Sequence, residues 1–217
     1  MIFMYGHMEI THLGHSSFKI RGKNLTLVTD PFLPEMVGLK FPKVEADIVT
    51  ISHNHEDHNQ ARLVGGQPRI FSGAGEYEVG GTKIVGIQTY HDNEKGAKFG
   101  KNTIYQIQMD GLILAHLGDL GGKLTTEQIE TLNGVDIIFV PVGGTFSLDA
   151  HNASEVVAQF EAKIVIPMHY GLPGLKIDLL PVDKFLEEMG KEEVKPQPKL
   201  VVTKDKLPDE LEIVVLA

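Results

Sequence analysis

The chain has 217 residues, a length that favours one domain with its own hydrophobic core. Apolar residues make up 42% and charged residues 23%, proportions of a soluble globular protein that argue against disorder or a fibrous repeat. The formal net charge of −9 at pH 7 argues against non-specific binding of nucleic acid, because phosphate binding needs clustered Lys and Arg. There is no cysteine, so a bound metal must be held by His nitrogens and carboxylate oxygens.

The first residues predict neither export nor membrane insertion. Met1 to Met8 has no basic start and contains no long apolar run. We therefore expect no membrane span and a cytoplasmic location. Because the first strand pattern begins near Met8, residues 1–7 are interpreted as an N-terminal extension.

The first half of the chain has the pattern of short strands joined by turns. Residues 46–51 are almost entirely apolar and β-branched, as in a strand covered on both faces, and they lead directly into a His-rich loop. Two hairpins follow, turning at Gly80-Gly81 and at Asp110-Gly111. The strands expected here span residues 9–13, 17–20, 25–29, 46–51, 84–90, 102–109 and 112–117.

The second half of the chain alternates helices with strands. A Thr-x-x-Gln type cap at Thr125 or Thr126 predicts the start of the first helix. Hairpins followed by this alternation predict an α/β architecture of two mixed β-sheets stacked face to face with helices outside. No repeat or low-complexity linker divides the sequence, so we expect a single domain over residues 1–217. The later elements expected are strands 135–142 and 162–168, helices 153–160 and 181–189, and final strands near residue 200 and over 211–216.

A dense group of potential metal ligands follows the apolar strand 46–51. The run is His53-Asn54-His55-Glu56-Asp57-His58, with three His and one Asp within six positions. A pattern of this kind arises by chance roughly once per thousand shuffled sequences, which favours a metal site over a solvated polar loop. Neutral imidazole and carboxylate suit Zn, Fe, Mn or Ni.

Four residues cannot complete two metal sites, and further candidates stand at other strand ends. His91 follows an apolar strand, Asp119 lies in His116-Leu117-Gly118-Asp119, and His169 closes the strand 162–168. Because the ends of parallel strands gather at one edge of a sheet, we expect these three side chains to converge with the His-rich loop.

These motifs resemble, in order and spacing, those of the metallo-β-lactamase superfamily. The segments Gly14-His15-Ser16-Ser17-Phe18 and Pro167-Met168-His169-Tyr170 are similar to its group of predicted metal-dependent hydrolases, which is related to L-ascorbate-6-phosphate lactonase. The resemblance implies a four-layer αββα sandwich. It also implies a dinuclear centre in which His53, His55 and His91 bind one metal, Asp57, His58 and His169 bind the second, Asp119 bridges both, and Asp30 supports the His loop from behind.

Four further residues are candidates for roles around the metals. His15 is interpreted either as a substrate-facing residue or as a turn residue, and His116 as a support that hydrogen-bonds the site without ligating. Lys101 and Asn102 follow a Gly-rich lead-in, so they either contact an anionic substrate or simply begin a strand.

The resulting functional hypothesis is a metal-dependent hydrolase acting on a small molecule. A hydroxide bridging two divalent cations, with Zn expected first and Mn, Fe or Ni as alternatives, would attack an ester, lactone, amide or phosphodiester. Asp57 is the candidate for orienting or accepting the nucleophile's proton. Two alternatives stay open, a di-iron redox enzyme served by a separate electron donor and a non-catalytic metal-holding module. The sequence also leaves homo-oligomerisation open.

Overall fold

The computed structural model describes residues 7–217, so the predicted N-terminal extension lies outside the described residues except for His7. Two β-sheets dominate the described chain. The six-stranded sheet has the order β12-β1-β2-β3-β4-β5, and the seven-stranded sheet has the order β13-β11-β10-β9-β8-β7-β6. The first comprises β1 (Met8–Gly14), β2 (Ser17–Arg21), β3 (Thr26–Thr29), β4 (Val44–Ile51), β5 (Val64–Ser72) and β12 (Leu200–Val202). The second comprises β6 (Gly75–Val79), β7 (Thr82–Tyr90), β8 (Lys101–Met109), β9 (Leu112–His116), β10 (Ile137–Pro141), β11 (Ile164–Met168) and β13 (Glu212–Ile213).

Both sheets are mixed, as predicted. In the six-stranded sheet, β3, β4 and β5 pair in parallel, whereas β12, β1, β2 and β3 pair antiparallel. In the seven-stranded sheet, β9, β10, β11 and β13 are parallel and β6 to β9 antiparallel. The parallel strands of each sheet therefore end on the same edge, where β3, β4, β9 and β11 lead into the loops of the candidate site.

The inner faces of the two sheets share one apolar core. Alternate residues of a strand point to opposite faces, so Ile10 and Phe18 of the first sheet meet Tyr105 and Phe139 of the second. The ring centroids of Phe18 and Phe139 lie 4.7 Å apart. Tyr105 also joins the sheets by a hydrogen bond, since its hydroxyl donates to the carbonyl of Ile51 over 3.0 Å.

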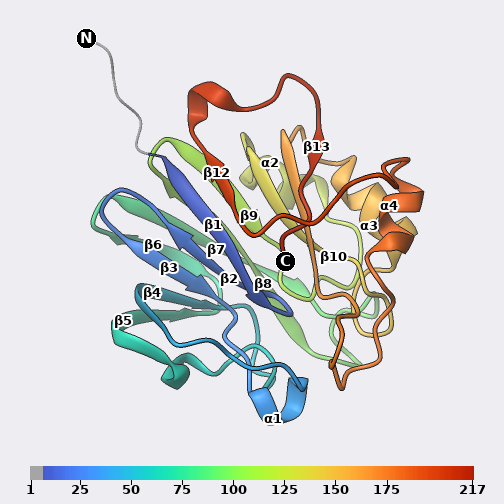
Figure 1. Ribbon diagram of the computed structural model, residues 1–217, viewed down its shortest axis with the longest axis horizontal. Helices are drawn as coiled ribbons and strands as arrows, with labels where there is room; N and C mark the ends of the chain where they lie inside the picture. Colours follow the sequence, from blue (N-terminus) through green and yellow to red (C-terminus); the bar gives the residue numbers. More distant parts are fainter. Residues whose placement is uncertain (1–6) are drawn as a thin grey trace.

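Helices cover mainly the outer face of the seven-stranded sheet. They are α2 (Thr126–Thr131), α3 (Ala150–Val157) and α4 (Asp183–Glu188), and α3 and α4 lie side by side beyond β10 (Figure 1). Val156 of α3 and Phe185 of α4 belong to the same buried cluster as Ile138 and Val165 of the sheet. Burying one such side chain contributes about 1.5–3 kcal/mol to folding.

The outer face of the six-stranded sheet has thinner cover than predicted. Its buried residues pack against Ala61 of the short helix η1 (Ala61–Leu63) and against Phe41. The remaining helices are the single turns α1 (Pro34–Val37) and η2 (Lys204–Lys206). The stacked mixed sheets are thus confirmed, and the outer helical layer on this side is reduced to short turns.

Element boundaries followed local sequence signals where these were strong. Thr125 is the N-cap of α2 in a complete capping box with Gln128, as expected. The helix predicted from residue 153 begins instead at Ala150, because the side chain of Asp149 accepts the backbone N–H of Asn152 and caps it there. Strand β5 was not predicted; its segment contains two Gly and one Pro, and its exposed edge position has little apolar alternation.

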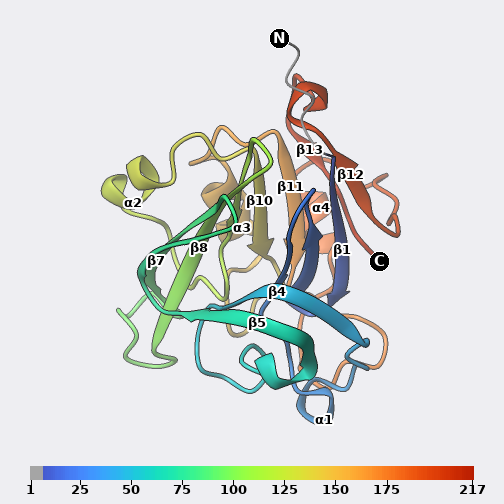
Figure 2. The ribbon, with the colours of Figure 1, turned by 90° about the vertical axis from the view of Figure 1, so that its left-hand side faces the viewer.

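The C-terminal ends of several strands face one end of the molecule. Figure 2 shows the arrowheads of β1 and β10 directed toward the end where α1 lies. Among residues 7–217 no helix is long and apolar enough to cross a membrane.

Candidate metal centre

The His-rich loop begins where β4 leaves the core. Ser52 to His58 turn sharply, and the backbone N–H of His58 donates to the carbonyl of His55 over 2.9 Å. This turn directs the imidazoles of His53 and His55 toward His91, which follows β7. Ligand atoms of these three residues all lie within 4.8 Å of one another, a spacing that one cation could span.

A second cluster of donor atoms forms from both sheets. His15 in the β1–β2 turn, Asp57 and His58 in the His-rich loop, and His169 after β11 place ligand atoms within 4.8 Å of one another. The backbone N–H of His169 donates to the carbonyl of His15 over 3.1 Å, which ties the two loops together. Both residues have positive φ, 53° for His169 and 56° for His15, so the backbone is locally strained at the cluster.

Asp119 lies between the two clusters. Its Oδ2 atom is 3.2 Å from Nε2 of His91 on one side, and 3.1 Å and 3.2 Å from Nε2 of His58 and His169 on the other. The residue before it, Gly118, has φ +56°, and a Cβ there would come within 2.3 Å of the Asn102 side-chain oxygen. Glycine is therefore needed for the turn that brings Asp119 to the centre.

A buried carboxylate holds two of the imidazoles from behind. Asp30 accepts hydrogen bonds from the Ser52 backbone N–H over 2.7 Å and from His58 Nδ1 over 2.9 Å. The Ser52 hydroxyl also donates to Asp30, so its oxygen is free to accept from His53 Nδ1 over 2.9 Å. Both imidazoles thus carry their protons on Nδ1 and turn their Nε2 atoms into the centre, the arrangement that metal-binding His usually has.

Burial and mutual charge set the pKa values of the site. Burial raises the pKa of Asp119, but the imidazoles of His169 and His58 outweigh it and hold that pKa well below its ordinary value. Burial would lower the pKa of His58, yet the carboxylates of Asp119 and Asp57 raise it well above its ordinary value. For His53, burial and the neighbouring His58 lower the pKa to about 3, which leaves a neutral imidazole at neutral pH.

The donor atoms fit divalent metal ions. His53 Nε2, His58 Nε2, Asp57 Oδ1 and Asp119 Oδ1 are buried without a hydrogen-bond partner among the described residues. Buried polar atoms without partners are costly, and imidazole nitrogens facing carboxylate oxygens are the ligands that zinc and related metals take. The structure thus brings all seven predicted ligands, His53, His55, Asp57, His58, His91, Asp119 and His169, to one place.

Two of the further candidates make contacts that the sequence did not indicate. His15 lies in the β1–β2 turn, one of its two expected positions, but it is 1% exposed and its Nε2 donates to Asp57 Oδ2 over 3.2 Å, so it contacts a predicted ligand. Asn102 was expected either to contact an anionic substrate or to begin a strand; it stands at the start of β8 and is fully buried, so the substrate contact is wrong. Its side-chain amide donates to Thr89 and Leu117 and accepts the Asp119 N–H. Asn102 therefore holds the Asp119 turn, and Lys101 beside it remains exposed.

His116 lies behind the site and not among its candidate ligand atoms. Its Nδ1 accepts the backbone N–H of Gly118 over 3.3 Å, which leaves the proton on Nε2 to donate to the carbonyl of Ser16 over 2.9 Å. This fully buried imidazole connects the Asp119 turn to the β1–β2 turn. Ser52, by contrast, was missed, because a lone Ser before a His carries no sequence signal for its contact with Asp30.

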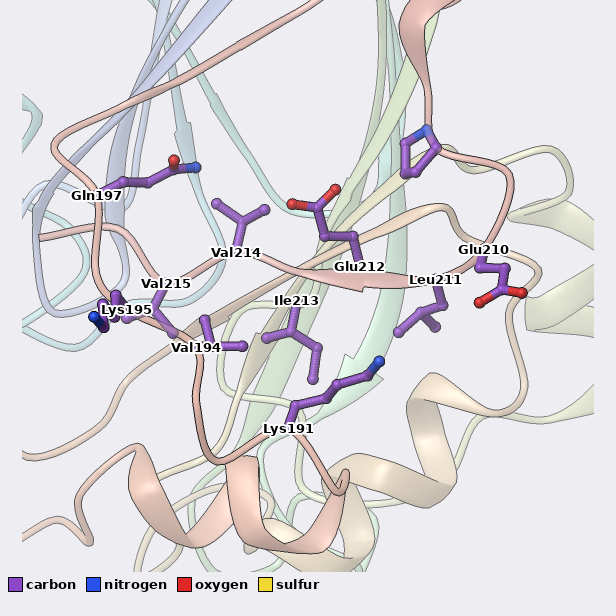
Figure 3. Close-up of a pocket in the computed structure, with 11 residues that line it drawn as sticks. Lys191, Val194, Lys195, Gln197, Glu210, Leu211, Glu212, Ile213, Val214 and Val215 are labelled. Atoms are coloured by element: carbon purple, nitrogen blue, oxygen red, sulfur yellow. The ribbon is translucent and has the colours of Figure 1, made fainter.

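Two cavities border the centre. One of about 540 Å³ has His55, Asp57, His91, Asp119 and His169 among its walls. The other, of about 500 Å³, lies against His53 and His55, and its walls include Lys101 and no carboxylate side chain. A third hollow of about 490 Å³ lies beside β13 and α4 (Figure 3), but it shares no residue with the centre and is lined by a mixture of Lys, Glu and aliphatic side chains.

Comparison with known proteins identifies relatives that all belong to one superfamily. A family model for the β-lactamase superfamily domain matches residues 9–169. A UPF0173 metal-dependent hydrolase of Thermococcus onnurineus is 30% identical over 190 residues, which cover 75% of this chain and 84% of that protein. One of Pelotomaculum thermopropionicum is 31% identical over 197 residues, with the same coverage.

A solved structure agrees with these matches. A protein of the metallo-β-lactamase superfamily from Thermotoga maritima superimposes with a TM-score of 0.81 and 38% identity, over 96% of this chain and 98% of that one. The relation to L-ascorbate-6-phosphate lactonase stays a prediction. The chain belongs to the metallo-β-lactamase superfamily and, within it, to the family of UPF0173 metal-dependent hydrolases.

Proposed function

We propose that the chain hydrolyses a small molecule with two divalent cations, zinc in the first instance, held by the seven ligands above. The observation that carries this proposal is the position of Asp119 between two groups of imidazoles, with unpaired buried donor atoms on both sides. Support for zinc comes from the Thermotoga protein, which is described as a candidate Zn-dependent hydrolase.

Two cations at such a centre supply an activated water and stabilise negative charge on the oxygen of the bond being cleaved. The chain's own residues would position the reactants. Asp57 lines the larger cavity, where its carboxylate can orient the proton of the attacking water, and His15 fixes that carboxylate from the buried side. Lys101 borders the adjoining cavity, which has no carboxylate side chain, so an anionic part of the substrate fits there.

The test combines metal content with hydrolysis. We expect about two equivalents of zinc per chain by elemental analysis, and cleavage of at least one class in a panel of esters, lactones, amides and phosphodiesters. Asp119→Ala should lose metal from both positions. Glu155→Ala, which removes a half-buried carboxylate of α3 that pairs with Lys123 away from the centre, should retain both.

Less than one equivalent of any transition metal would refute the two-metal site. A fully loaded protein that cleaves none of the panel would favour the metal-holding module, and reversible iron redox chemistry after anaerobic preparation would favour the di-iron alternative.

A further inference from the structure

The larger cavity beside the metal centre has an apolar side. The residues that line it include the predicted ligands His55, Asp57, His91, Asp119 and His169. Its apolar wall consists of Met36, Phe99, Phe146 and Ile177, which come from four separate segments of the chain, and Phe99 lies next to His91, with ring centroids 5.3 Å apart. A volume of about 540 Å³ falls in the range of cavities that bind small molecules.

Two of these wall residues are unusually exposed. Met36 is 42% and Phe146 39% exposed, and they are among only six large apolar side chains exposed within residues 7–217. Exposed apolar side chains that line a cavity favour ligand binding, because apolar surface left in water is stabilised when a partner covers it. The pair therefore marks the cavity as a place where an apolar group is buried.

The segments that carry the wall are ordered by their own hydrogen bonds. The carboxylate of Asp92 accepts four backbone N–H groups of its loop, including that of Phe99 over 2.8 Å. The ring of Phe99 then meets Phe146 edge to face, with centroids 5.9 Å apart. Met36 lies on α1, which Gly38 closes with a left-handed C-cap. The wall is thus preformed, so little ordering cost opposes binding.

The charged groups at the cavity argue against an anionic ligand on this side. Lys176 donates to the carbonyl of Glu35 over 3.0 Å, so its ammonium is directed to α1. Asp178 is an exposed carboxylate that also lines this cavity and would repel an anion. Lys101, whose positive charge could attract an anionic substrate group, borders the adjoining cavity and not this one.

We infer that Met36, Phe99, Phe146 and Ile177 form a subsite for an uncharged apolar group, an acyl chain or aromatic ring, attached directly to the bond that the metals act on. The inference rests on the proposed function, since it places the scissile bond at the metal centre. The natural substrate is accordingly an ester, amide or lactone with an apolar acyl side, and its polar part extends past His55 toward Lys101.

Metal-chelating hydroxamates test this subsite without turnover. Acetohydroxamate and hexanohydroxamate carry the same chelating group and differ by four methylenes. Each fully buried methylene strengthens binding about fourfold, so with partial burial we expect hexanohydroxamate to bind the zinc-loaded protein at least about tenfold more tightly by calorimetry. In Phe146→Ser the ratio of the two affinities should fall to about twofold. Val201→Ser, which replaces an exposed apolar residue on β12, should keep the wild-type ratio.

A second measurement keeps the subsite testable if zinc does not bind. In protein labelled with ¹³C on the methionine methyl groups, 1-hexanol should shift the Met36 resonance, which Met36→Leu identifies, in the presence or absence of metal. Equal affinities for the two hydroxamates, or no shift of Met36 with 1-hexanol, would overturn the subsite. Tight binding of hexanohydroxamate with no cleavage of any acyl substrate would instead refute the hydrolase and leave the subsite standing.

Discussion

Replacing Asp30 by Ala tests how far the metal centre depends on the residues behind it. Asp30 is fully buried and accepts the Ser52 backbone N–H, the Ser52 hydroxyl and His58 Nδ1. Without the carboxylate, the Ser52 hydroxyl can rotate to another acceptor, but the Ser52 N–H and the His58 N–H have none. An unsatisfied buried donor costs about 1–3 kcal/mol, so two donors cost about 2–6 kcal/mol of unfolding free energy.

The same substitution should weaken metal binding. His58 would lose the bond that fixes its ring and its tautomer, and loss of such a partner reduces metal affinity about 10–100-fold. This corresponds to about 1.4–2.8 kcal/mol of binding free energy. The effect should fall first on the position that His58 shares with Asp57 and His169.

Two assays measure these losses separately. Urea unfolding of the chelator-treated protein, followed by circular dichroism, gives the stability change, and zinc titration against a competing chelator gives the affinity of each position. Asp47→Ala is the matched control, because this exposed carboxylate accepts a single backbone N–H, from Thr26, away from the metals. We expect it to cost at most about 1 kcal/mol and to leave zinc affinity unchanged. An Asp30→Ala protein whose zinc affinities stay within twofold of wild type would refute the reasoning.

Three further predictions follow from contacts described above. Tyr105→Phe should lower the unfolding free energy by about 0.5–1.5 kcal/mol in urea titration, since one buried hydrogen bond to Ile51 is lost, and a change in zinc affinity would contradict this purely structural role. Backbone N–H groups, that of Phe99 foremost, lower the pKa of Asp92 from 3.8 to about 2. The ionised Asp92 carboxylate therefore stabilises its loop fully above pH 4, and this stabilisation is lost as the pH falls toward 2. Asp92→Asn should accordingly accelerate hydrogen exchange of amides 94–99 at neutral pH. Unchanged protection of these amides would contradict the role given to Asp92. At a free zinc concentration of 100 times the dissociation constant, removing the zinc should lower the unfolding free energy by about 2.7 kcal/mol, or the Tm by about 5–10 °C in calorimetry. An unchanged Tm would show that the metal does not stabilise the fold.

The sequence was most informative where chemistry and local geometry coincide. His53 to His58 follow an apolar strand so closely that their position at a sheet edge could be predicted, and His91, Asp119 and His169 shared the same strand-end signal. The stacked mixed sheets followed from hairpins and then strand–helix alternation, and the comparisons confirm that fold and the family.

Contacts between distant segments could not be predicted in this way. Asn102 looked like a surface residue beside Lys101, yet the pairing of β7 with β8 buries it under the Asp119 turn. His15 could be placed in a turn but not against Asp57, 42 positions away. The apolar wall likewise joins Met36 of α1 to residues of three loops, and loop shape depends on packing and not on any local periodicity.

The distribution of the ligands over both sheets has a consequence for a chain without cysteine. His58 lies in the loop after β4 of the first sheet and His169 directly follows β11 of the second, and 111 positions separate them (169 − 58). An ion held by both residues would act as a cross-link that closes this loop, much as a disulfide does. For a disulfide, a loop of about 100 residues corresponds to about 4.7 kcal/mol of lost entropy in the unfolded chain. Such an ion would thus be a removable cross-link between the two sheets, and the supply of metal in the cell would determine how often the sheets separate.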